Sequence, residues 1–217
     1  MNHITLTIHT FPDANPTVRR HWPYYEKAGA DKIILITTND GGCEVPPGVT
    51  HEMIGPSLYI RGRHLPSRLL RTFEHLISFT KSDWFAVAEY DTLWFKPIPR
   101  DLPLGLTSHL AGGKMPGSHC NFFCHNPWIV DRDTACKIVD TGNEILHSGN
   151  FDPSPDLFIG HVAEVAGIKV HTDILKSYSR NTIHAPWDDE ALAAIRAGAV
   201  CVHGVKTPDV FQKLTAL

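Results

Sequence analysis

Apolar segments of strand length recur along this chain and are separated by segments with helical periodicity. The strand-length segments are residues 4–10, 32–37, 84–88, 107–109, 122–125 and 199–203. Strands that alternate with helices are typical of a layered α/β domain with a largely parallel sheet. The pattern therefore predicts an α/β sandwich in which helices cover a mixed, mainly parallel central sheet.

Four helices are expected between these strands, each starting at a residue that suits a helix N-terminus. They start near Asn15, Ser67, Asp131 and Ser154, and proline directly follows the first and the last of these. Side chains of Asn, Ser and Asp accept hydrogen bonds from the first backbone amides of a helix, and proline fits its first turn. Apolar residues then recur on one helix face, which is expected to pack against the sheet.

The length and composition suit one globular domain, residues 1–217. Hydrophobic residues make up 42% and charged residues 20% of the chain, as in ordinary folded proteins. The net charge is −3 and the 20 Lys and Arg residues are scattered, which argues against nucleic acid or an anionic membrane as a partner. No segment has the pattern of a transmembrane helix or a signal peptide. Five irregularly spaced cysteines are typical of reduced thiols, so a cytoplasmic location is expected.

The most informative segment is the acidic turn formed by Glu89, Tyr90 and Asp91. It follows segment 84–88, whose apolar residues on both faces indicate a strand covered by helices on each side. Open parallel sheets bind ligands beyond the carboxyl ends of their strands, and carboxylates one residue apart can point to the same side. Such a pair repels itself unless a cation joins it, and Mg²⁺ or Mn²⁺ binds carboxylates together with phosphate oxygens. The turn therefore predicts a divalent-metal site that binds a diphosphate.

Residues 83–93, with the sequence DWFAVAEYDTL, resemble the strand and acid-x-acid motif of metal-dependent glycosyltransferases of the GT-A fold. The usual form of that motif is Asp-x-Asp, and Glu89 stands here in place of the first Asp. The resemblance implies a Rossmann-like three-layer sandwich that binds a nucleotide-sugar through Mn²⁺ or Mg²⁺. Asp91 is then expected as a direct metal ligand, whereas Glu89 contacts the metal directly, through water or through the donor sugar.

A second segment, 199–206, resembles the C-terminal segment of several GT-A families, in which a histidine completes the metal site and a lysine contacts the diphosphate. Here the apolar strand ends at His203, followed by Gly204 and Lys206. The chemistry is reasonable, because Mn²⁺ accepts an imidazole among oxygen ligands and an ammonium stabilises a departing phosphate. His203 is therefore expected as the third metal ligand and Lys206 as a diphosphate contact.

The resemblance further implies that residues 1–98 bind the nucleotide-sugar and residues 99–217 bind the acceptor. Donor contacts are expected from the ends of the first two strands, the acidic turn and the helix that precedes it: Thr10, Phe11, Thr38, Arg68, Arg71, Glu89 and Tyr90. The alternative is that one or both arginines are solvated and do not contact the donor. Asp156 lies in the first turn of a helix, where inverting enzymes of this superfamily often place the catalytic base. An acid at that position is also favourable through the helix dipole alone.

A zinc site in residues 119–125 is an alternative, because this segment holds two histidines and two cysteines. If the segment is a strand, Cys120 and Cys124 share a face but lie about four rises of 3.3 Å apart, too far to bind one ion. No further pair of cysteines or histidines follows at a suitable spacing. Buried thiols are therefore expected at this place.

Other nucleotide-binding enzymes fit the sequence less well. Residues 10–20 contain no glycine, which argues against a sugar nucleotidyltransferase or a dinucleotide-binding dehydrogenase. Together with the resemblance, the sequence predicts an inverting transferase that moves a sugar from a UDP-sugar to a hydroxyl acceptor. The alternative from another class is a non-catalytic nucleotide-sugar or carbohydrate-binding domain, since a site can persist without chemistry.

Overall fold

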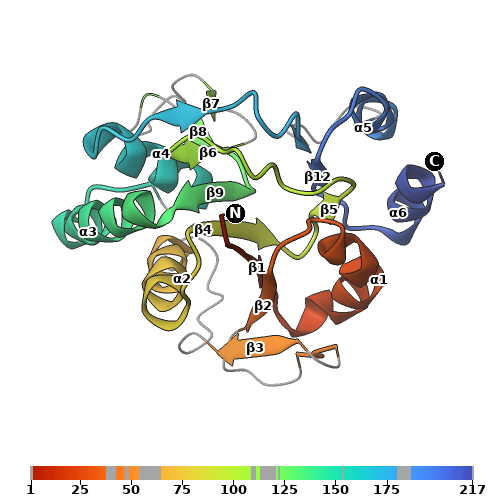
Figure 1. Ribbon diagram of the computed structural model, residues 1–217, viewed down its shortest axis with the longest axis horizontal. Coiled ribbons are helices and arrows are strands. Elements are labelled where there is room, and N and C mark those ends of the chain that lie inside the picture. The colour runs from red at the N-terminus through yellow and green to blue at the C-terminus, as the bar shows by residue number, and fades with distance from the viewer. Residues whose placement is uncertain are drawn as a thin grey trace.

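The computed structural model describes residues 2–37, 43–46, 49–53, 65–108, 111–112, 121, 123–152, 154–179 and 187–216. Its central sheet has seven described strands in the order β10-β6-β9-β4-β1-β2-β3 (Figure 1). Their bounds are β1 Ile4–His9, β2 Lys32–Thr37, β3 Thr50–Met53, β4 Trp84–Glu89, β6 Leu106–Thr107, β9 Trp128–Asp131 and β10 Val170–His171. Among them, β9 runs antiparallel to its neighbours β4 and β6, whereas the other pairings are parallel. The sheet is therefore mixed and mainly parallel, as the sequence predicts.

Two smaller sheets and seven helical segments make up the rest of the secondary structure in the described residues. One small sheet has the order β11-β12-β5 and the other pairs β7 with β8. Their bounds are β5 Leu93–Trp94, β7 Ala111–Gly112, β8 Phe123–Cys124, β11 Tyr178–Ser179 and β12 Cys201–His203. The helices are η1 Pro12–Ala14, α1 Asn15–Glu26, α2 Leu65–Phe79, α3 Arg132–Ser148, α4 Pro155–Val165, α5 Trp187–Arg196 and α6 Pro208–Thr215.

The central sheet is covered on both faces, which gives three layers (Figure 1). On one face, α2, α3 and α4 pack against strand side chains that include Phe85 and Val130. On the other face, α1 and the β11-β12-β5 sheet pack against side chains that include Leu6 and Ala86. Helices α5 and α6 pack against this small sheet through a further apolar cluster around Val202. The predicted Rossmann-like three-layer sandwich is confirmed.

The chain reverses its direction across the sheet at β1. From β1 it passes through α1 to β2 and on to β3, and α2 then returns it to β4 on the other side of β1. The carboxyl ends of β1 and β4 lie level, because His9 stands opposite Glu89 in the parallel register. Such a reversal leaves a crevice at the carboxyl edge, where open α/β sheets bind their ligands.

Helix α3 begins as the sequence predicts, with the side chain of Asp131 as its N-terminal cap. One carboxylate oxygen accepts a hydrogen bond from the Thr134 amide at 2.9 Å, and the other accepts from the Gly105 amide at 2.8 Å. Burial raises the pKa of Asp131, but a hydrogen bond from the Thr134 hydroxyl, together with the two from backbone amides, outweighs burial and brings the pKa below its usual value. The same carboxylate thus starts α3 and fixes the chain just before β6.

Three details of the predicted elements are wrong. The residue at the N-terminal cap of α1 is Ala14, so Asn15 lies inside this helix and is not its cap. Helix α2 already includes Leu65, and Pro66 lies in its first turn, so Ser67 lies inside the helix and is not its cap. The strand expected at 122–125 is only β8, which pairs with β7 outside the central sheet. The strand that joins the central sheet there is β9, whose four residues are all buried and therefore show no alternation of apolar and polar side chains.

Candidate metal and nucleotide site

Three potential metal ligands meet at the carboxyl end of β4. Glu89 ends this strand, Asp91 follows it, and His203 ends β12. In the part of the chain that the structure describes, each of these side chains offers one ligand atom, and the three atoms lie within 4.8 Å of one another. Ligands of one Mg²⁺ ion lie about 2.0–2.1 Å from it, so opposite ligands are about 4.2 Å apart. The cluster predicted from sequence is therefore brought together at nearly the spacing that one ion requires.

The pairing of β5 with β12 brings His203 to the acidic turn. The chain leaves Asp91 directly into β5, where Leu93 stands opposite Val202 in an antiparallel register. Beyond the strand, the Val205 amide donates a hydrogen bond to the carbonyl oxygen of Asp91 at 2.9 Å. This connection also places the Lys206 ammonium 3.6 Å from the Asp91 carboxylate.

The carboxylate of Asp91 has the properties expected of a metal ligand. Its side chain is fully buried, and neither oxygen has a hydrogen-bond partner among the described residues. Removing a carboxylate from water is costly unless hydrogen bonds or opposite charges compensate it. Lys206 is 64% exposed, so its ammonium compensates this buried charge only in part, and the imidazole of His203 lies 3.3 Å away. A divalent cation would complete the compensation, which means that these residues fit the expected ion.

Glu89 is more open to solvent than Asp91 and points toward the crevice. Its carboxylate lies 3.8 Å from Nε2 of His203 and is 40% exposed. Burial is the main cause that raises the pKa of Glu89, His203 opposes this effect, and the carboxylates of Asp91 and Asp156 add to it. Negative charge is thus concentrated at this edge of the sheet, as a cation site requires.

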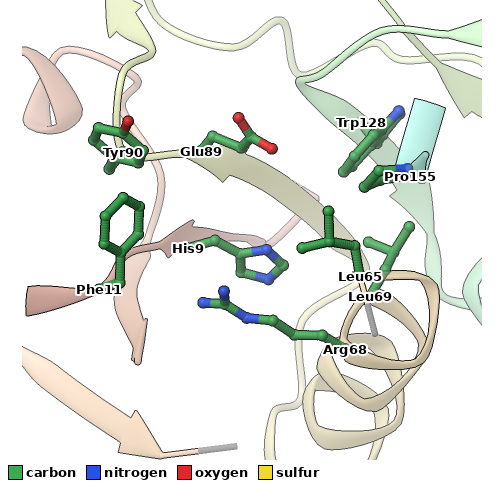
Figure 2. Close-up of a pocket in the computed structure, with 9 residues that line it drawn as sticks. All are labelled: His9, Phe11, Leu65, Arg68, Leu69, Glu89, Tyr90, Trp128 and Pro155. Carbon is green, nitrogen blue, oxygen red and sulfur yellow. The ribbon is translucent and has the colours of Figure 1, made fainter. Parts of the chain in front are cut away.

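A pocket lies beside this cluster at the same edge of the sheet (Figure 2). Its lining comes from the ends of β1 and β4, the start of α2, and single residues of β9 and α4: His9, Phe11, Leu65, Arg68, Leu69, Glu89, Tyr90, Trp128 and Pro155. The rings of Phe11 and Tyr90 meet edge to face, with their centroids 5.1 Å apart. Because Glu89 belongs to both the group of candidate metal ligands and the pocket lining, a molecule bound in the pocket would lie next to the metal site.

The pocket also contains the polar side chains of His9 and Arg68 (Figure 2). The guanidinium of Arg68 donates hydrogen bonds to the carbonyl oxygens of Thr10 and Ile36, at 3.2 and 3.4 Å. His9 contacts the Thr72 hydroxyl at 2.9 Å, and burial, followed by the Arg68 charge, lowers its pKa well below the usual value. The pocket therefore presents one neutral imidazole and one cation, and a guanidinium suits a phosphate or a base edge.

Asp156, the expected catalytic base, lies in the first turn of α4 and pairs with a histidine from another part of the chain. Oδ2 of Asp156 lies 3.1 Å from Nδ1 of His125, and both side chains keep part of their surface exposed. The preceding residue, Pro155, lines the pocket. An aspartate held through one oxygen by an imidazole N–H keeps its other oxygen available to accept a proton.

The remaining predicted donor contacts are Thr10, Arg71 and Thr38, and the two that the structure describes are not among the residues that line the pocket. Thr10 is 1% exposed and is not among the pocket-lining residues, although its carbonyl oxygen anchors Arg68. Arg71 is exposed on α2 and does not line the pocket either. Thr38 lies outside the described residues, as do His119 and Cys120 of the zinc alternative. The cysteine of that segment that is described, Cys124, is buried as expected.

Several residues of the site were not predicted from the sequence. His9 lies directly before two predicted donor contacts at the end of β1, and this position was the available signal. His125 contacts Asp156 across 31 positions, and nothing in the sequence links the two. Asn126 accepts a hydrogen bond from the Glu89 amide at 3.1 Å, and Thr92 contacts His203 at 3.1 Å. Both lie beside predicted elements, but their contacts depend on how distant strands pair.

The comparisons with known proteins assign the chain to no family. No family model matches the chain, and the comparison with curated proteins finds no match. No helix in the described ranges is long and apolar enough to cross a membrane. Function therefore has to be inferred from the geometry and chemistry of the site.

Proposed function

We propose that this protein is a metal-dependent glycosyltransferase of the GT-A type. It would move a sugar from a nucleoside diphosphate, expected to be UDP, to a hydroxyl group of an acceptor, with inversion at the anomeric carbon. The observation that carries the proposal is the cluster of Glu89, Asp91 and His203 at the reversal point of the sheet. Reversal points of open α/β sheets bind ligands, and two carboxylates with an imidazole suit Mn²⁺ or Mg²⁺.

The residues around the cluster suit a nucleoside diphosphate. A bound Mn²⁺ or Mg²⁺ would offset the negative charge of the diphosphate leaving group. The Lys206 ammonium, 3.6 Å from Asp91, is near enough to the cluster to contact the same phosphates. Phe11 and Tyr90 offer aromatic surface for the base, and Arg68 offers a guanidinium to the base or a phosphate. The pocket and the neighbouring cluster therefore offer partners for the base and the diphosphate of a nucleoside diphosphate.

The acceptor would be activated by Asp156. In an inverting transfer, the bond from the anomeric carbon to the diphosphate oxygen breaks while a bond from the acceptor oxygen forms. The proton of the acceptor hydroxyl passes to the Asp156 carboxylate, which acts as the general base. His125 lies 3.1 Å from Oδ2 of this carboxylate, which leaves Oδ1 available to take the proton. His125 is thus a positioning residue in the proposed reaction.

The proposal retains the single domain 1–217 and the cytoplasmic location. The pocket draws most of its lining from residues 1–98, whereas Asp156 and His203 come from residues 99–217. The four described cysteines, Cys43, Cys124, Cys136 and Cys201, are thiols, which is in keeping with a reducing compartment.

Turnover is the direct test of this function. The protein is incubated with Mn²⁺ and a panel of nucleotide-sugars, and the release of nucleoside diphosphate is followed with and without candidate hydroxyl acceptors. At least one donor should be consumed, and the variant Asp91→Asn should lose that activity. If no donor is consumed although UDP binds in a metal-dependent manner, the protein is instead a non-catalytic binding domain.

A further inference from the structure

A chain of buried hydrogen bonds connects two of the three candidate metal ligands. Asn126 is 2% exposed and lies between the ends of β4 and β9. Its Oδ1 accepts from the backbone amide of Glu89 at 3.1 Å and from the hydroxyl of Thr92 at 3.5 Å. The same hydroxyl oxygen lies 3.1 Å from Nδ1 of His203. One amide side chain therefore holds the backbone of Glu89 and, through Thr92, the ring of His203.

The orientation of the Asn126 amide is fixed by two backbone groups whose roles are certain. Its Nδ2 donates to the carbonyl oxygen of Val87 at 3.3 Å, and its Oδ1 accepts from the Glu89 amide. A flipped amide would face a carbonyl with an acceptor and an N–H with a donor, and both hydrogen bonds would be lost. The atom that contacts Thr92 is therefore the carbonyl oxygen of Asn126, which can only accept.

This orientation favours one position for the proton of His203. Because Oδ1 of Asn126 only accepts, the Thr92 hydroxyl donates its proton to it, and the Thr92 oxygen is left to accept from His203. Nδ1 of His203 then carries the proton in the neutral ring. The carboxylate oxygen of Asp91, 3.3 Å from the same nitrogen, independently favours a proton there. Nε2 keeps its lone pair and lies on the side of Glu89, at 3.8 Å from its carboxylate.

We propose that Thr92 and Asn126 are positioning residues that hold His203 in the Nδ1–H form, so that its Nε2 faces the metal cluster as a ligand. The inference deepens the proposed function and rests on it, because it concerns the same metal. Metal-bound histidines commonly donate their other ring N–H to a fixed acceptor, which orients the ring and selects the tautomer. Here a buried hydroxyl, itself held by a buried amide, provides that acceptor.

Two measurements test the assignment, and the first needs neither metal nor activity. The nitrogen NMR spectrum of the metal-free wild-type protein, at a pH above the usual imidazole pKa of about 6.5, reports which ring nitrogen carries the proton. The His203 signal is assigned by its loss in the His203→Gln variant. The Nδ1–H form should dominate in the wild type and in Thr92→Ser, whereas Thr92→Val should contain a mixture of both tautomers. A wild-type ring with its proton on Nε2 would overturn the proposal.

The second measurement is the affinity for Mn²⁺ alone, followed through the electron paramagnetic resonance signal of the free ion. Thr92→Val should lower this affinity by roughly 10–100-fold, as is usual for groups that orient metal ligands, and Thr92→Ser should retain it. Melting curves of the wild-type protein and of each variant show whether each is folded. Wild-type affinity in Thr92→Val, together with lost affinity in His203→Gln, would contradict the positioning role and leave the metal site standing. Unchanged affinity in His203→Gln and Asp91→Asn would instead refute the metal site itself.

Discussion

The substitution Asp91→Asn separates a structural aspartate from a metal ligand, because it removes the charge and keeps the shape. The wild-type carboxylate is fully buried and has no hydrogen-bond partner among the described residues. Its ion-pair partner Lys206 is 64% exposed and 3.6 Å away, so solvent weakens their attraction. A buried carboxylate that is incompletely compensated costs several kcal/mol. The metal-free variant should therefore be at least as stable as the wild-type protein.

Metal should reverse this order of stability. A ligand at 100 times its dissociation constant stabilises a fold by about 2.7 kcal/mol. In a protein of this size, each kcal/mol raises the melting temperature by roughly 2–4 °C, so Mn²⁺ should raise that of the wild-type protein by about 5–11 °C. The Asp91→Asn protein lacks a ligand and should show only a small part of this rise.

The assay is thermal unfolding, followed by circular dichroism in EDTA and in excess MnCl₂. A matched control is Asp140→Asn, which removes an exposed carboxylate from α3 and should keep the full rise. Two results would refute the reasoning. One is a full Mn²⁺-dependent rise in Asp91→Asn, and the other is a metal-free variant that melts far below the wild-type protein.

Three further predictions concern the catalytic base, the pH dependence of stability due to the buried His21, and helix packing. Asp156→Asn should leave Mn²⁺-dependent UDP affinity unchanged in calorimetry but slow transfer by about 10²–10⁴-fold, and full transfer activity would exclude Asp156 as the base. Burial and Arg20 lower the pKa of His21 to about 3. Because the unfolded value is about 6.5, the stability due to neutral His21 is complete above that pH and falls by about 1.4 kcal/mol per unit below it. Between pH 6.5 and pH 5, urea unfolding should show a smaller loss of stability in His21→Phe than in the wild-type protein. An identical loss in both proteins would contradict a neutral, buried His21. Gly142→Ala should destabilise the fold by about 1–3 kcal/mol, and an unchanged urea midpoint would show that the helices can separate to accommodate it. The added Cβ would lie 2.5 Å from a methyl carbon of Leu70 on the neighbouring helix α2.

The elements that were predicted well from sequence are those with a local signal. β2 has the predicted bounds, and β1 and β4 differ by one residue at their ends. β2 and β4 contain continuous apolar runs, and β1 alternates isoleucine or leucine with threonine, so each carries a local strand signal. β9 was missed because its residues Trp128–Asp131 are buried on both faces and too few to show a period. Its place between β4 and β6 depends on long-range pairing that no local pattern contains.

The same distinction applies to the site. Glu89 and Asp91 could be predicted because the chain changes abruptly from apolar to acidic at the end of a central strand. The contact between His203 and Asp91 joins residues 112 positions apart through the pairing of β12 with β5, which the sequence does not reveal. The contact of His125 with Asp156 depends on how α4 docks beside β8. Residue types could thus be predicted, whereas the partners that orient them could not.

A crystal of the protein with Mn²⁺ and UDP, measured for the anomalous signal of manganese, tests the central claim most directly. The account predicts one strong anomalous peak bonded to Nε2 of His203 and to Asp91, next to Glu89, with the UDP diphosphate beside it and the base near Phe11 and Tyr90. UDP bound in the pocket without a manganese peak at these residues, or manganese bound only elsewhere, would contradict it.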